Sequence, residues 1–308
     1  MKPAPFAYVA PRSIDEAIGA LAAADEDTKI LAGGQSLIPL LNMRLASPKR
    51  LVDLGRVPEL AYVTERDGGY VIGAMTRQST LERDARIARD LPLLAEAIAW
   101  VGHPQIRNRG TVGGSIAHGD PAAELPTVAV CLDARITVRS ARGTRTLDAR
   151  NLYLGYLATT LAPDELLTEL WLPQAPPSTG YAWLEFARRH GDYAIAGVGI
   201  AVALAGDVIS EARIVVTGVG GTPVRATAAE ATLAGARPDE RGQVDARHVA
   251  EAVAALRAAV EPSADVQATA EYRRHLAGVL TERALPIACR RAAAGAGEAP
   301  LALGDGDD

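Results

Sequence analysis

The sequence predicts a two-domain α+β protein, and three observations support this prediction. The chain has 308 residues, more than the roughly 250 residues that one hydrophobic core usually serves. Strand-like and helix-like segments alternate through the first half, whereas strands precede helices in the second half. A proline-rich segment at 173–178 separates the halves. We therefore expect one domain at 1–176, a second at 177–292 and a disordered tail at 293–308.

The first half opens with a helix at 14–21, because Ser13 and Glu16 form a capping box ahead of apolar residues at helical spacing. Further strands are predicted at 28–32, 51–54 and 70–75, and further helices at 37–45, 91–101 and 122–132. A glycine-rich polar stretch at 110–120 is expected to be a loop. This alternation of strands and helices predicts an α/β arrangement.

The second half follows a different order. Strands are predicted at 165–172, 181–189, 198–204 and 212–219, and alanine-rich helices at 227–233, 246–260 and 269–294. A run of consecutive strands favours an antiparallel sheet, and helices that follow it can cover one face. The second domain is therefore expected to be α+β.

Composition excludes several classes of protein. The 32 basic and 37 acidic residues give a net charge of −5 without a long block of one sign, which argues against nucleic-acid and membrane-surface binding. No apolar run approaches the ~18 residues of a membrane span, and no export signal is visible at the start, so we expect a cytoplasmic protein. Two cysteines, Cys131 and Cys289, cannot supply the roughly four thiolates of an iron–sulfur cluster, and we expect both in the core.

Two double-glycine segments are the candidate ligand-binding sites. The first ends a strand and opens a helix, and consists of Lys29, Ile30, Leu31, Ala32, Gly33, Gly34, Gln35, Ser36 and Leu37. The second consists of Thr111, Val112, Gly113, Gly114 and Ser115. Glycine can adopt φ > 0 and has no Cβ, so successive amides can surround an anion, and a helix start adds about half a positive charge.

Two such segments suit a diphosphate, which carries two charged groups side by side. Neither a P-loop nor a Rossmann fingerprint occurs in the sequence. A dinucleotide would therefore bind on another scaffold.

The same segments resemble the motifs of a known family. Residues 32–39 read AGGQSLIP and resemble the AGG-[HQ]-SL-x-P motif of molybdenum hydroxylase flavoproteins, and residues 111–124 read TVGGSIAHGDPAAE and look like the second motif of that family. Shorter matches lie at 6–13, 191–194, 218–226 and 272–276. Over about residues 4–292 the chain is thus similar to the FAD-binding medium subunits of the carbon monoxide dehydrogenase and xanthine dehydrogenase family.

This resemblance implies a two-lobed FAD-binding domain of the vanillyl-alcohol-oxidase (PCMH) type, followed by a carbon monoxide dehydrogenase flavoprotein-like α+β domain. It implies that both double-glycine loops wrap the FAD pyrophosphate with their backbone amides. Glu124 matches a position that bonds a ribose hydroxyl, Leu167 a position near the nucleotide, and Tyr193 a position that borders the isoalloxazine ring. Glu185 departs from the family, because some relatives place a cofactor-binding lysine there.

Simpler structural roles compete with these assignments. His118 and Asp120 belong to the second motif and are candidate cofactor contacts. However, Asp120 could cap a helix with Pro121 at its first position, and His118 could be a turn residue. Glu124 could merely complement the helix dipole, and Tyr193 could be a half-buried strand aromatic.

The function that the resemblance implies is electron transfer within a heterotrimeric molybdenum hydroxylase, assembled as a dimer of heterotrimers. Substrate reacts at a molybdenum cofactor in a large subunit, and electrons pass through two [2Fe–2S] clusters of a small subunit to FAD in this chain and then to an external acceptor. No catalytic side chain and no metal ligand is predicted here. A free-standing FAD oxidoreductase and a scaffold subunit without flavin remain alternatives. The large subunit sets the substrate, which leaves carbon monoxide, aldehydes and N-heterocycles open.

Overall fold

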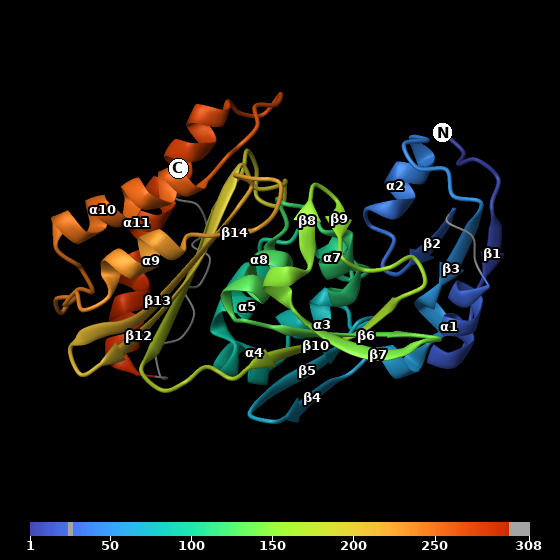
Figure 1. Cartoon of the computed structure of the whole chain (residues 1–308), viewed down its shortest axis with the longest axis horizontal. Coiled ribbons are helices and arrows are strands. Elements are labelled where there is room, and N and C mark those ends of the chain that lie inside the picture. The colour runs from blue at the N-terminus through green and yellow to red at the C-terminus, as the bar shows by residue number, and fades with distance from the viewer. Residues whose placement is uncertain (24–26, 296–308) are drawn as a thin grey trace. The chain divides into compact units, whose positions relative to one another are not determined.

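The computed structural model describes residues 1–23 and 27–295, which form two compact units (Figure 1). The first unit comprises Met1–Leu81, His103–Gly119 and Asp133–Pro173. The second comprises Glu82–Gly102, Asp120–Leu132 and the described residues from 174 to 295. Two segments from the first half of the sequence thus complete the second unit. The consecutive domains drawn from the sequence stay a prediction.

A three-stranded parallel sheet forms one part of the first unit. Its order is β1-β3-β2, with β1 at Ala7–Val9, β3 at Arg50–Asp53 and β2 at Thr28–Leu31. Helix α1 (Ile14–Ala22) begins as predicted, since the Ser13 side chain accepts the Glu16 amide at 3.1 Å. Helix α2 (Leu37–Asn42) follows β2 and is shorter than expected.

The other sheet of the first unit has five strands in the order β4-β5-β10-β6-β7, and all neighbours are antiparallel. These strands are β4 (Val63–Arg66), β5 (Gly69–Gly73), β10 (Leu166–Pro173), β6 (Arg135–Ser140) and β7 (Gly143–Asp148). The predicted α/β alternation is therefore wrong for this sheet. Tight hairpins replace crossover helices: Asp67 and Gly68, for example, turn β4 into β5 with φ of 54° and 68°.

Short elements connect these sheets. They are α3 (Gln78–Glu82), α6 (Pro104–Arg107), α7 (Val112–His118), β8 (Tyr153–Gly155), β9 (Ala158–Thr159) and the 3-10 turns Leu54–Arg56, Pro58–Leu60 and Ala149–Asn151. Most are too short to show an apolar period, and the sequence analysis missed them for that reason.

The second unit contains the predicted antiparallel sheet. Its strands lie in the order β11 (Thr179–Phe186), β12 (Ala196–Ala205), β13 (Val208–Thr217) and β14 (Val224–Arg225). Helices α9 (Thr227–Leu233), α10 (Ala246–Ala259) and α11 (Ala270–Ala294) follow close to their predicted positions. Figure 1 shows them on one side of this sheet. Helices α4 (Ala85–Asp90), α5 (Pro92–Ile98) and α8 (Glu124–Cys131) complete the unit.

Alternation along the strands assigns each helix layer to a face of this sheet. A Cβ on Gly180 would lie 1.9 Å from the Ala288 carbonyl oxygen of α11. A Cβ on Gly199 would instead approach Leu93 of α5, and the Cys131 thiol of α8 donates to the Gly199 carbonyl at 3.6 Å. Side chains of successive strand residues point to opposite faces, so α11 covers one face and α5 with α8 cover the other.

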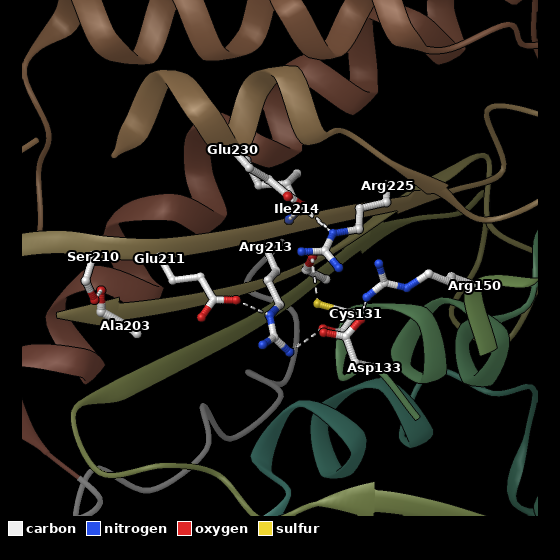
Figure 2. A network of polar contacts seen from close by, with 11 residues as sticks. Cys131, Asp133, Arg150, Ala203, Ser210, Glu211, Arg213, Ile214, Arg225 and Glu230 are labelled. Carbon is white, nitrogen blue, oxygen red and sulfur yellow. Dashed lines mark hydrogen bonds and ion pairs between the residues drawn. The ribbon is translucent and has the colours of Figure 1, made fainter. Parts of the chain in front are cut away.

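Polar contacts join the helices to β13 (Figure 2). The Glu230 carboxylate of α9 accepts the Ile214 amide at 2.9 Å and the Arg225 side chain at 3.0 Å. Arg213 donates to the Cys131 carbonyl at 3.4 Å, at the end of α8. These contacts add directional hydrogen bonds to the apolar packing between strand and helices.

Both cysteines are fully buried, as expected of core residues. Helix α11 extends through Ala294, beyond the predicted start of the tail at 293, because alanine favours the helix until Gly295. The remainder of that tail lies outside the described residues. Among the described helices, none is long and apolar enough to cross a membrane.

Candidate functional site

The two double-glycine segments contact each other within the first unit. A Cβ on Gly33 would lie 2.5 Å from the Arg109 carbonyl oxygen and 3.1 Å from the Thr111 nitrogen. A Cβ on Gly114 would lie 3.4 Å from the Ala32 Cβ. The absence of side chains therefore lets two backbones meet. Segments about 80 residues apart in sequence form one glycine-lined surface, to which both motifs contribute.

The first segment offers a run of backbone donors. The amides of Gly33, Gly34, Gln35 and Ser36 have no acceptor among the described residues. Gly34 has a φ of 77°, which is the left-handed conformation that glycine accepts without strain. The Gln35 side-chain amide donates to the Gly33 carbonyl at 3.0 Å and closes the turn. Such consecutive free amides are suited to surround an anion.

The second segment differs from its prediction, because it is the first turn of α7 rather than a loop. Thr111 caps this helix and accepts the Gly114 amide at 3.2 Å, while the Ser115 amide donates to the Thr111 carbonyl. The Gly113 amide donates to the Ala74 carbonyl at 2.8 Å. Neither glycine has a positive φ. Both glycines instead permit close approach, because a Cβ on Gly113 would lie 2.5 Å from that of Ala74.

Other candidate residues also lie in the first unit. Lys29, Ile30 and Leu31 form most of β2, which delivers the chain to the first segment. His118 is the last residue of α7, and Gly119 follows it with a φ of 66°, so His118 does stand beside a turn. Leu167 is a buried residue of β10.

Asp120 and Glu124 lie in the second unit. The predicted cap is wrong, because α8 begins at Glu124 and its N-cap residue is Ala123. The Asp120 carboxylate instead accepts the Ala122 amide at 2.9 Å and stabilises the turn that precedes α8. Glu124 is 7% exposed and occupies the first turn of the helix, where a negative charge is favourable.

Tyr193 lies in the connection between β11 and β12 and is 58% exposed. The alternative of a half-buried strand tyrosine is therefore wrong. The connection is held by Arg273 of α11, which donates to the Ile195 carbonyl at 2.7 Å and the Gly218 carbonyl at 3.0 Å. Arg273 itself is 6% exposed. In the sequence, the helical spacing of Arg273 from the buried residues Leu276 and Leu280 of α11 could have predicted its burial.

Glu185 is also buried, although the sequence analysis considered it only as a departure from the family. It is 7% exposed on β11, and its carboxylate accepts the Trp183 indole N–H at 3.2 Å. The second unit thus contains two buried acids, Glu124 and Glu185.

Known proteins match this arrangement along almost the whole chain. A family model described as the FAD binding domain in molybdopterin dehydrogenase matches residues 4–175, and one described as the CO dehydrogenase flavoprotein C-terminal domain matches residues 181–288. The chain belongs to the molybdenum hydroxylase flavoprotein subunits. This finding confirms the predicted family, the fold class and FAD as the cofactor.

Individual relatives of this flavoprotein subunit agree. The 6-hydroxypseudooxynicotine dehydrogenase complex subunit alpha of Paenarthrobacter nicotinovorans is 43% identical, with 95% of this chain and 97% of the relative covered. The carbon monoxide dehydrogenase medium chain of Hydrogenophaga pseudoflava is 36% identical, with 95% and 100% covered. In solved structures, reconstituted CO dehydrogenase from Oligotropha carboxidovorans matches with a TM-score of 0.90 at 37% identity, covering 94% of this chain and 100% of that chain.

Proposed function

We propose that this flavoprotein subunit transfers electrons within a cytoplasmic, heterotrimeric molybdenum hydroxylase that assembles as a dimer of heterotrimers. It would receive electrons from two [2Fe–2S] clusters of a small subunit and pass them to an external acceptor, after a large subunit with a molybdenum cofactor has oxidised the substrate. The observation that carries the proposal is the contact between the two double-glycine segments, beside which the first segment presents four free amides.

The first double-glycine segment fits the diphosphate of FAD. We assign the diphosphate to the amides of Gly33, Gly34, Gln35 and Ser36, because these donors lack acceptors among the described residues. The amides of the second segment already donate within the chain, so its role is to support the first segment. When bound, FAD supplies the redox chemistry, since a flavin exchanges electrons singly or in pairs.

Three further side chains are assigned by the family resemblance. Glu124 would accept a ribose hydroxyl, Leu167 would pack near the nucleotide, and Tyr193 would border the isoalloxazine ring. The exposure of Tyr193 supports this assignment, because an aromatic side chain left accessible by its own unit is available to a planar ligand.

The need for partners is supported by the cysteine count. Two buried cysteines cannot ligate iron–sulfur clusters, so clusters that deliver electrons must belong to another chain. The relative from Paenarthrobacter nicotinovorans is likewise named as a subunit of a dehydrogenase complex.

The test is purification of the tagged chain from its native host, followed by mass spectrometry of co-purifying chains, metal analysis and chromatography of the flavin released on denaturation. We expect one FAD per chain, together with iron, molybdenum and two other subunits. A homogeneous chain that oxidises substrate without either metal would instead establish a free-standing oxidoreductase. A folded complex without flavin would establish a scaffold subunit.

A further inference from the structure

Residues 74–78, which follow β5, run alongside the start of the second double-glycine segment. Backbone hydrogen bonds of 2.8, 3.0 and 3.0 Å join them to residues 110–113. Arg77 and Thr111 form an antiparallel bridge in the middle of this contact. We call residues 74–78 the supporting segment, because their hydrogen bonds fix the backbone that precedes and begins α7.

The Arg109 carbonyl oxygen lies where the two double-glycine segments meet. A Cβ on Gly33, which is itself buried, would lie 2.5 Å from this oxygen. Among the described residues no backbone amide donates to it, and its donor is Nη1 of the Arg77 side chain. Arg77 of the supporting segment thus satisfies the carbonyl against which the first segment packs.

The surroundings of Arg77 keep its guanidinium at this position. The residue is half-buried. Burial first, and then the positive charge of Arg109, lower the pKa of Arg77, whereas the charge of Asp53 raises it. Asp53 ends β3 beside the end of β2, the strand that leads into the first segment. Because arginine stays protonated in proteins, the Arg109 carbonyl accepts a charge-assisted hydrogen bond, which is roughly twice as strong as a neutral one.

We propose that Arg77 is a positioning residue for the FAD diphosphate. Its guanidinium holds the Arg109 carbonyl against Gly33 and thereby fixes the direction of the free amides of the first segment. Arginine suits this role better than lysine, because its planar group is pre-organised and loses less entropy for each hydrogen bond. The positioning role rests on the proposed function, in which those amides bind the diphosphate. The hydrogen bond from Arg77 to the Arg109 carbonyl does not.

A purely electrostatic role of Arg77 makes a different prediction. A positive charge would attract the diphosphate whether or not Gly33 has a side chain, so the effects of changing the two residues would multiply. A positioning role acts through the contact at Gly33. Once that contact is broken by Gly33→Ala, removal of the Arg77 side chain should have little further effect, because residues that act through one contact are not additive.

The hydrogen bond is tested by hydrogen–deuterium exchange of the full-length, deflavinated protein. Arg77→Met keeps an unbranched side chain and removes the donor and the charge. It should accelerate exchange of the amides at 110–113, which are held by the supporting segment. Arg12→Met, which changes an exposed arginine of the same unit, is the matched control and should leave this exchange unchanged.

The positioning role is tested by titrating the same proteins with FAD. Arg77→Met should weaken binding roughly tenfold or more, because a charged hydrogen bond is lost. Arg77→Lys, which still donates, should recover part of this loss, and Arg12→Met should bind like the wild type. The double variant of Gly33→Ala and Arg77→Met should bind within about twofold of the weaker single variant.

The outcomes separate the claims. Unchanged exchange at 110–113 in Arg77→Met would overturn the hydrogen bond, and faster exchange throughout the first unit would show that Arg77 stabilises the whole unit rather than this contact. Normal FAD affinity in Arg77→Met, or effects that multiply in the double variant, would overturn the positioning role. If the wild type binds no FAD at all, the proposed function fails, whereas the exchange result still decides the hydrogen bond.

Discussion

Gly33→Ala is the most direct perturbation of the contact between the two double-glycine segments. The new methyl group would lie 2.5 Å from the Arg109 carbonyl oxygen and 2.8 Å from Cα of Gly110, whereas ordinary contacts begin near 3.4 Å. The obstructing atoms belong to the backbone and cannot rotate away as a flexible side chain could. One methyl group is therefore sufficient to separate the segments, and a β-branched residue is unnecessary.

The second segment resists this displacement. Its neighbours are fixed by backbone hydrogen bonds, from Gln78 to the Gly110 carbonyl at 3.0 Å and from Gly113 to the Ala74 carbonyl at 2.8 Å. The movement therefore falls on the first segment, which carries the free amides. Overpacking of this kind costs about 1–3 kcal/mol, and FAD affinity should fall by a factor of roughly 5 to 150 if binding requires the original geometry.

The assay is a fluorescence titration of deflavinated protein with FAD, accompanied by a thermal melt. Gly19→Ala is the matched control, since a Cβ there meets nothing within 4 Å and the residue lies within α1 of the same unit. Alanine in a helix is favoured over glycine by about 1 kcal/mol, so this control should bind FAD normally and melt no lower. Unchanged affinity and melting temperature in Gly33→Ala would refute the close contact of the segments.

Three further predictions concern the second unit. Tyr193→Ala should retain FAD with roughly tenfold lower affinity and a shifted flavin potential, and its melting temperature should not change because the Tyr193 side chain is 58% exposed. A large loss of stability with an unshifted potential would show that Tyr193 does not border the flavin. Burial raises the pKa of Glu185 to about 9, so the folded state keeps a proton that the unfolded state loses, and the stability measured by urea unfolding should fall as the pH rises from about 5 to about 9. This contribution is complete below the unfolded-state pKa of 4.5 and lost above 9, so the fall should be steeper in the wild type than in Glu185→Gln, and equal slopes would contradict the prediction. Glu96→Gln should lower the free energy of unfolding by about 3–5 kcal/mol in the same assay, because it leaves Arg291 charged and buried. The control is Glu251→Gln, which removes an exposed helical ion pair, and an equally small loss in both variants would show that the buried pair does not stabilise the fold.

Local signals in the sequence were sufficient for most of the secondary structure and for the first segment. The capping box at Ser13 and the alanine-rich segments of α9, α10 and α11 predicted helices that the structure contains, because helix starts and apolar periods depend on neighbouring residues. The Gly33-Gly34 turn after β2 was recognisable for the same reason. The family motifs, which span most of the chain, identified FAD and the fold class.

Only the tertiary structure decided which backbone atoms come into contact and which acidic side chains are buried. Gly113 and Gly114 look like a loop in the sequence, but both lie in α7, which Thr111 caps, and the contact of Gly113 with Ala74 requires the absence of a side chain. Glu185 lies across Gly197 from Thr217 only because β11, β12 and β13 pair in register. Close approach and burial depend on segments that are distant in the chain. The sequence around a residue therefore does not show whether its amide is free or whether its pKa is shifted.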